Sequence, residues 1–374
     1  MKKNACLCIG FILLLGLLAP AAAQEEKTEA KLVTITNDKK PSPATGEATR
    51  LVLIEDYAVG DSEKEEEMIA QLTFFAVDED EILYVLDIKG HCVKVFDSSG
   101  TYVRTIGSQG QGPGELNMPA GIQITPENEL MIEDIMNRRL SYFTLTGEFI
   151  KTVSVADKTS LINLFLDKEG SAVGRELVLD DGKMFWEIRK YDRELKPLFT
   201  LDKVEFQNPL QGKKLNPFSF TVVVQYDEAG DIYFGKADDY TIQVYNPDGA
   251  LTKNIQKKYD KVKLTQEDKD RMLAEIPDMG VGINIKEMFE FPDAFPPYES
   301  FTLTEEGRIV VKTYEKGPVE GEYFLDVFNR DGKYIARIPS AANPRLWKNG
   351  KLYSIENTEE DYKVIKRYSA SWEN

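Results

Sequence analysis

A strand-and-turn pattern that returns along almost the whole chain is the strongest constraint on its fold. Each copy contains a strand, an acidic or glycine turn, two further strands, an Asp/Asn-x-x-Gly-type turn and a last strand. The first copy runs from Leu72 to Ile106, and its later turn is Asp97-Ser-Ser-Gly100. The two turns are 18 or 19 residues apart over 81–100, 129–147 and 230–249, and 25 apart over 170–195 and 307–332. Such regular spacing indicates an internal repeat.

Six copies of this unit predict an all-β protein with the six-bladed β-propeller fold. A four-stranded antiparallel sheet of this size cannot bury both faces alone, so the units must stack, and radial stacking closes a ring. The sixth copy has only three evident strands before the chain stops. We expect a strand at Leu51–Tyr57 to complete it, because this removes an exposed sheet edge. Seven blades are the alternative if residues 24–50 are ordered.

The N-terminus has the pattern of a secretory signal peptide. A basic start with Lys2 and Lys3 precedes an apolar run over 9–18, and Ala21 and Ala23 lie at the positions that signal peptidase recognises. We therefore expect residues 1–23 to be removed after Ala23, which predicts a secreted or periplasmic protein. Residues 24–48 are polar and predict a flexible leader, so the propeller domain would cover 49–374. No other stretch is apolar and long enough to predict membrane insertion of the mature chain.

One repeat resembles the NHL-repeat family of six-bladed β-propellers. Three segments approximate the family's linker, strand and turn: residues 107–116 of the Gly-rich connector 107–118, the Pro119-Ala-Gly-Ile122 strand, and the turn from Asp134 through Asn137 to Leu140. Elsewhere only fragments match: the first repeat has Asp87, but Gly90 and His91 stand where Asn and Arg are expected. The resemblance implies the fold; it implies no single activity, because the family contains both binding modules and unrelated enzymes.

Composition excludes several classes of function. The formal net charge is −17, which repels phosphate backbones, so we expect no nucleic-acid partner. The chain has a single histidine, His91, which argues against the multi-histidine metal site of the related propeller lyases. Related lactonases use Glu, Asn and Asp, oxygen ligands that suit Ca²⁺. The predicted inner strands, such as Val222-Val-Val224, are nevertheless largely apolar.

The loops predict which face of the ring binds a ligand. Loops between second and third strands share one face with the connectors between blades, and on this long-loop face the segments vary in length. The longest is an insertion at about 257–297, between blades four and five, where Thr265 is a helix start and Pro277 a helix stop. This insertion could cover the channel mouth or pack onto apolar surface. The candidate ligand-binding residues on this face are His91, Asp134, Asn137, Arg138, Asp180, Asp238 and Asp239.

These features favour a non-enzymatic binding or scaffold protein whose ligand is a protein, peptide or glycan. Arg138 and Arg139, beside Asp134, could bind an anion as forked donors, or an arginine could pair with Asp134 and fix the turn. We predict no catalytic residue and no bound cofactor. The alternative is a Ca²⁺-dependent hydrolase or lactonase acting at the mouth of the central channel. A third hypothesis is a subunit of an envelope complex.

Overall fold

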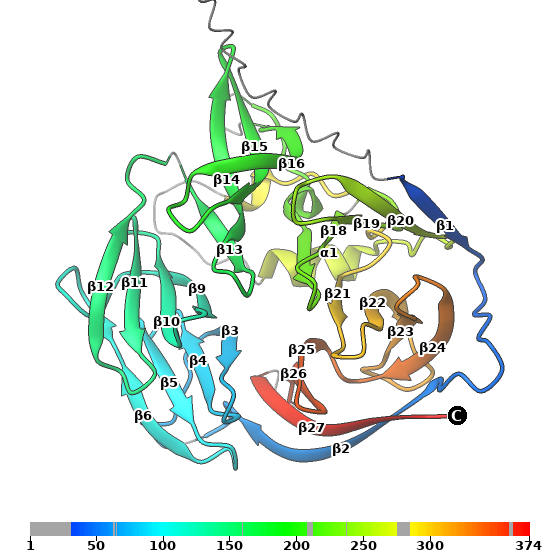
Figure 1. Ribbon diagram of the computed structural model, residues 1–374, viewed down its shortest axis with the longest axis horizontal. Coiled ribbons are helices and arrows are strands. Elements are labelled where there is room, and N and C mark those ends of the chain that lie inside the picture. Colours follow the sequence, from blue (N-terminus) through cyan, green and yellow to red (C-terminus); the bar gives the residue numbers. More distant parts are fainter. Residues whose placement is uncertain are drawn as a thin grey trace, which may run out of the picture.

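The computed structural model describes residues 31–374 except 63, 65, 159, 208–211, 237, 275–284 and 359–361. The predicted signal peptide, residues 1–23, lies outside this part of the chain. Six sheets surround a central axis, so the six-bladed propeller is confirmed (Figure 1). Each contains four antiparallel strands, and one of them carries a fifth strand. No helix in the described part of the chain has the length and apolar character needed to cross a bilayer.

The blades follow one another in chain order from the inner strand outward. Blade one contains β3 (Leu72–Val77), β4 (Leu83–Asp87), β5 (Cys92–Phe96) and β6 (Tyr102–Ile106). Blade two contains β9 (Pro119–Ile124), β10 (Glu129–Asp134), β11 (Arg139–Thr144) and β12 (Phe149–Ser154). Blade three contains β13 (Ile162–Leu166), β14 (Ala172–Asp180), β15 (Lys183–Tyr191) and β16 (Pro197–Glu205). Blade four contains β17 (Val222–Tyr226), β18 (Ile232–Lys236), β19 (Thr241–Tyr245) and β20 (Leu251–Lys257). Blade five contains β21 (Ser300–Leu303), β22 (Ile309–Lys316), β23 (Tyr323–Phe328) and β24 (Tyr334–Ser340).

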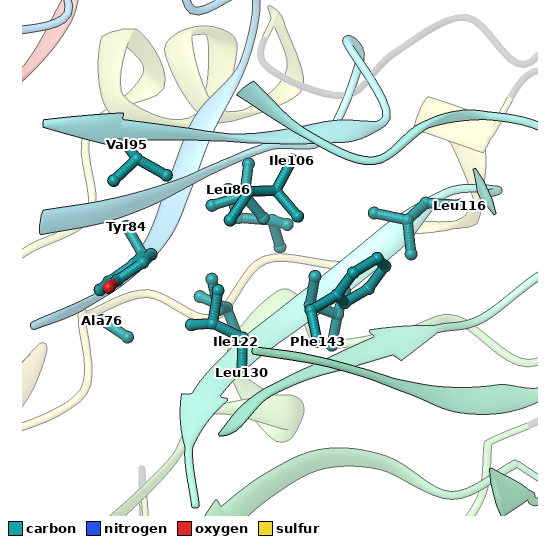
Figure 2. Packing of buried hydrophobic residues seen from close by; sticks show 11 residues of the cluster. Ala76, Tyr84, Leu86, Val95, Ile106, Leu116, Ile122, Leu130 and Phe143 are labelled. Carbon is teal, nitrogen blue, oxygen red and sulfur yellow. The ribbon is translucent and has the colours of Figure 1, made fainter. Parts of the chain in front are cut away.

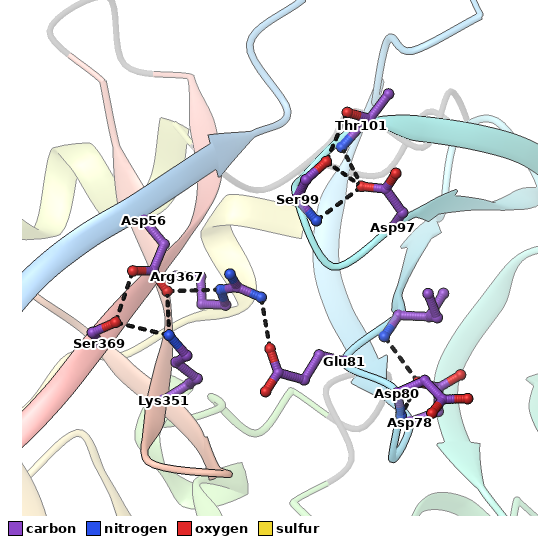
Figure 3. Close-up of polar contacts among 11 residues, drawn as sticks. Asp56, Asp78, Asp80, Glu81, Asp97, Ser99, Thr101, Lys351, Arg367 and Ser369 are labelled. Atoms are coloured by element: carbon purple, nitrogen blue, oxygen red, sulfur yellow. Dashed lines mark hydrogen bonds and ion pairs between the residues drawn. The ribbon is translucent and has the colours of Figure 1, made fainter.

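Blade six is assembled from both ends of the domain. Its strands are β25 (Pro344–Lys348), β26 (Lys351–Asn357), β27 (Lys363–Glu373) and the early strand β2 (Arg50–Val59), which pairs antiparallel with β27. The strand expected at Leu51–Tyr57 therefore completes the ring. Arg367 of β27 reinforces the closure, because it binds Asp56 of β2 and Glu81 of blade one, each at 2.9 Å (Figure 3). Lys351 and Ser369 also donate to Asp56.

The repeated turns are built by local hydrogen bonds that the sequence specifies. Asp97 accepts the backbone N–H groups of Ser99 and Thr101 at 2.9 and 3.0 Å, and Gly100 has φ 81° (Figure 3). A side-chain oxygen that bonds to amides two and four residues ahead folds the chain into a tight turn. A Cβ on Gly100 would lie 2.7 Å from the Tyr57 ring, so the turn also packs against β2. Aspartate or asparagine has the same role at Asp167, Asp192, Asp227, Asn246 and Asn329.

Alternating side chains of each sheet form the boundaries between blades. In β4, Tyr84 and Leu86 pack towards blade two, whereas Leu83 and Val85 pack towards blade six. Figure 2 shows the first of these clusters, in which Ile122 meets residues of blade one. Similar buried clusters lie at the other boundaries. The core is thus a series of interfaces between neighbouring sheets. This is expected for stacked units, because each sheet buries both of its faces against its neighbours.

Part of the predicted flexible leader is a strand. Within 24–48, β1 (Val33–Asn37) pairs parallel with β20 and becomes the fifth strand of blade four. The side chain of Asn37 fixes it, donating to the carbonyls of Gln256 and Gly332 and accepting from the N–H of Tyr334. The prediction of a flexible leader is wrong for these residues. Although they are ordered, they add a strand to blade four and do not form a seventh blade.

Among its described residues, the insertion between blades four and five contains the α-helix α1 (Gln266–Ala274) and a short 3-10 helix at Ile285–Met288. Thr265 and Asp268 form a reciprocal cap at the start of α1, as the sequence predicts. The expected helix stop at Pro277 lies outside the described residues. The insertion packs on the connector before blade four, with a bridge between Leu215 and Phe289, and Figure 1 shows α1 near the centre of the ring.

Candidate ligand-binding site

The candidate residues in blade two hold backbone segments in place. Asp134 is fully buried and accepts the N–H of Asn117 at 2.8 Å, the Asn137 amide at 2.7 Å and Arg139 Nε at 2.9 Å. Arg139 also donates to the carbonyls of Gln111, Gly112 and Glu115, which belong to the connector 107–118. The arginine that pairs with Asp134 therefore fixes the turn and the connector.

Arg138 and His91 also contact backbone. Arg138 donates to the carbonyls of Ala156 and Lys158, in the connector to blade three. His91 has φ 51°, and its Nδ1 accepts the N–H of Met118 at 3.0 Å. Both residues join a loop of one blade to the next connector, so their contacts stabilise the ring.

The remaining candidates lie on blades three and four. Asp180 is at the tip of the β14–β15 hairpin and pairs with Lys203 at 2.7 Å. Asp238 pairs with Lys236 at 3.0 Å, and Asp239 is exposed beside it. Among the seven candidates only Asp238 lines either of the two cavities described next. The sequence-predicted residues do not converge on one site.

A central channel of about 920 Å³ lies along the axis, and all six inner strands contribute to its wall. It reaches the first turns of the blades at Asp78 and Lys348, and the connector side at Thr73 and Arg345. Apolar side chains such as Phe165 line it between these ends. Each inner strand is the terminal strand of its sheet, so its main-chain groups on the axial edge add donors and acceptors to the wall.

The carboxylates of the channel already have partners. Asp78 accepts the N–H groups of Asp80 and Ile82 and the Tyr84 hydroxyl. Asp167 pairs with Lys190, and Glu299 pairs with Lys312 at 3.0 Å. In the described part of the chain, no group of three or more His, Cys, Asp and Glu residues is arranged to hold a metal ion.

A side pocket of about 270 Å³ lies between blades three and four on the long-loop face. Most of its blade-three wall is formed by residues that alternate along the strands and just beyond β16: Arg175, Trp186, Ile188, Asp202, Val204 and Phe206. Glu205 and Gln207 also line the pocket. The register explains this wall, because Trp186 pairs with Val204, Ile188 pairs with Asp202, and Phe206 follows two residues after Val204. The opposite wall comes from the connector before β17 and from Lys236 and Asp238 of blade four.

Charged groups meet at this side pocket. Lys236 Nζ lies 3.4 Å from Asp202 Oδ1 and 3.0 Å from Asp238 Oδ2. Burial opposes the charge of Lys236, but its hydrogen bond to Asp238 and the charge of Asp202 outweigh this effect, so the pKa of Lys236 is raised. Arg175 lies over the Trp186 ring, 5.6 Å from the ring centroid, and burial lowers the pKa of its guanidinium.

Sequence reasoning missed most of the side pocket because it considered loop tips. Arg175 and Trp186 lie inside strands, and their common face follows from the alternation of side chains in β14 and β15. The long strand pair at 172–191 was the available signal, because its two strands have nine residues each, whereas the second and third strands of blades one, two and four have five or six. The position of Asp202 on the same face could not be read locally, since a bulge between Ile188 and Arg189 sets it.

The repeated sheets and the ligand-sized central channel define a six-bladed β-propeller. Residues 67–366 match the DUF5128 family, described as a 6-bladed beta-propeller, and the chain belongs to that family. A comparison with curated protein sequences finds no match.

Several solved structures share the fold at low sequence identity. A candidate exported protein of Bacteroides fragilis is 12% identical with a TM-score of 0.57, covering 91% of this chain and 100% of its own. A DUF4221 member of Bacteroides vulgatus is 13% identical with a TM-score of 0.53, covering 87% and 100%. A gluconolactonase of Xanthomonas campestris is 14% identical with a TM-score of 0.45, covering 86% of this chain and 89% of its own.

Proposed function

We propose that the protein is an exported, NHL-like propeller that acts as a non-enzymatic binding or scaffold protein. It holds a protein, peptide or glycan on its long-loop face. The observation that carries this proposal is the meeting of two cavities there: the central channel and the side pocket share Arg175, Ile188, Thr221 and Val222 in their walls. The channel volume of about 920 Å³ falls in the range of known ligand sites.

The chemistry of the walls supports binding. Free strand edges and mixed apolar and polar side chains offer hydrogen bonds and contact area, which are the requirements of recognition. The carboxylates at the channel ends are engaged in turns and ion pairs, as Asp78 and Asp167 illustrate. Because these carboxylates are bonded to protein groups, they act as structural parts of the scaffold.

Two independent observations support export. The N-terminal sequence has the basic, apolar and small-residue segments of a signal peptide. The candidate exported protein of Bacteroides fragilis has the same fold over 91% of this chain.

The proposal is tested by binding of the chain from residue 24 onward to immobilised peptide and glycan arrays. Thr221→Trp adds bulk where the two cavities meet, whereas Thr105→Trp adds the same bulk on an exposed outer strand. We expect a ligand whose affinity falls at least about tenfold in the first variant and is unchanged in the second. Absence of any ligand, or equal binding by both variants, would contradict the proposal.

A further inference from the structure

We propose that the side pocket between blades three and four is a carbohydrate subsite that receives one neutral sugar ring. This inference rests on the proposed binding function and names the ligand class of one part of the site. Four features support it: an aromatic wall, a fixed polar group, a balance of charge and a matching volume.

The aromatic wall suits the C–H faces of a sugar. Trp186 and Phe206 stand perpendicular on the blade-three side, with ring centroids 6.1 Å apart, and Phe218 lines the pocket from the connector. A pyranose ring carries an apolar C–H face, and burial of that face against aromatic rings removes apolar surface from water.

The polar group suits hydroxyls. Asp202, Lys236 and Asp238 form a chain of charge-assisted contacts at the pocket, and each has hydrogen-bonding capacity beyond these contacts. Charged donors and acceptors make the stronger hydrogen bonds to a neutral partner. A sugar hydroxyl can donate to a carboxylate while it accepts from the ammonium, which satisfies both partners at once.

The charges within the pocket balance. Arg175 and Lys236 supply two positive charges, and Asp202 and Asp238 supply two negative ones. Glu205 also lines the pocket, but it is compensated from outside the lining by Lys183 at 3.3 Å and Lys213 at 3.5 Å. A charged ligand would add an uncompensated charge to a partly buried site. An apolar peptide side chain would desolvate the carboxylates without giving them hydrogen bonds. A neutral polyhydroxylated ring avoids both costs.

The volume fits one ring. About 270 Å³ corresponds to about nine water molecules at ~30 Å³ each, which is space for a single pyranose. The walls shared with the central channel at Thr221 and Val222 give a longer glycan a continuous path for its next units.

The test is ligand-observed saturation-transfer NMR on the chain from residue 24 onward. The probes are methyl glycosides of glucose, galactose, mannose and N-acetylglucosamine, with glucuronic acid and glucosamine as charged comparators. Asp238→Ala removes the exposed acceptor of the pocket. The matched control is Asp180→Ala, which removes another exposed, lysine-paired aspartate outside the pocket. Trp186→Leu is a second variant, and thermal unfolding checks that each variant folds.

We expect at least one neutral glycoside to receive saturation, strongest on the C–H groups of one ring face. Its affinity should fall at least about tenfold in Asp238→Ala and Trp186→Leu and stay unchanged in Asp180→Ala. Binding of peptides or proteins without any neutral sugar would overturn the carbohydrate subsite and leave the proposed function standing. Tighter binding of a charged comparator, or sugar binding that both pocket variants retain, would also overturn it. Failure of every ligand class would reject both proposals.

Discussion

Buried carboxylates in this molecule fix segments of backbone that are distant in sequence. Asp134 joins its own turn to the connector 107–118 through Arg139 and Asn137. Glu133, its neighbour, accepts the N–H groups of Asn163 and Leu164 at 2.8 Å and so fixes the start of blade three. Adjacent acidic residues of β10 therefore position the connectors on both sides of blade two.

We predict that Arg139→Ala destabilises the protein by about 3 kcal/mol, because it leaves the buried Asp134 carboxylate without its cation. The adjacent Arg138→Ala is the matched control, since Arg138 is exposed and its guanidinium donates to two backbone carbonyls. We expect a smaller loss from it. Urea unfolding measures the free energy of unfolding of both variants. Equal losses would mean that the ion pair between Arg139 and Asp134 contributes no more to stability than the contacts of Arg138.

Glu133 gives a prediction on pH. Burial raises the pKa of its carboxyl from 4.5 to about 7, although hydrogen bonds from Leu164 and Asn163 act in the opposite direction. The folded state therefore prefers the protonated form. Below pH 4.5 the carboxyl is protonated and costs no stability. Above about pH 7 it is ionised in the folded state as well, and this ionisation lowers the free energy of unfolding by about 3 kcal/mol.

We accordingly expect Glu133→Gln to gain stability relative to the native chain as pH rises from 4.5 to 7. The glutamine amide itself can change the stability, but this change is independent of pH and does not affect the trend. Urea unfolding across the pH range measures it. A flat difference for Glu133→Gln would show that the carboxyl does not titrate in this window.

At the scale of elements, β1 shows how a short polar strand is held in place. Most of β1 is exposed, but Asn37 is buried and its three hydrogen bonds connect blade four to blade five. The strand is parallel to β20, so no tight turn joins the two, and its register depends on contacts far away in the chain.

We predict that Asn37→Ala lowers the free energy of unfolding by about 2 kcal/mol, because it leaves buried backbone groups unsatisfied. Thr36→Ala, at an exposed position of the same strand, is the control and should change little. Equilibrium denaturation measures both, and hydrogen exchange at Tyr334 reports the local effect. An unchanged Tyr334 exchange rate in Asn37→Ala would contradict this role for the side chain.

Local signals explain which elements could be predicted. Turns such as Asp97–Gly100 are encoded within five residues, so the blades and their order followed from the sequence. The strand at 33–37 was missed, because its partner groups at Gln256 and Gly332 are distant and Lys39, Lys40 and Pro41 suggested a leader. The side pocket was missed for a similar reason: the faces of Trp186 and Asp202 depend on strand register and a bulge.

At the scale of the whole molecule, closure of the ring depends on β2. Burial opposes ionisation of Asp56, but hydrogen bonds from Lys351 and Ser369 and the nearby positive charges outweigh it, so the pKa of Asp56 is lowered. Its contribution to stability is therefore present above pH 3.8 and is lost as pH falls further. The boundary between blades six and one also buries Val59 and Ile365.

We predict that removal of residues 1–60 is far more damaging than removal of residues 1–48. The shorter truncation removes β1 from one edge, whereas the longer one also removes β2 and opens the ring. Circular dichroism melting and size-exclusion chromatography should show a cooperative transition and no aggregation for the first, and aggregation for the second. Equal behaviour of the two chains would contradict the closure role of β2.

We also predict that calcium and a chelator leave the melting temperature unchanged. The reason is that Asp78, Asp167 and Glu299 of the channel are already bonded to protein groups. A calcium-dependent rise in the melting temperature would favour a metal-dependent hydrolase instead.

The shared origin of blade six has a consequence for synthesis. Since β2 must wait for β27, a nascent chain presents its first long strand unpaired throughout translation of the five intervening blades. Ring formation therefore requires that β27 has been synthesised and has left the ribosome. A premature stop codon anywhere before Lys363 leaves β2 without a partner strand, however many blades have already been translated.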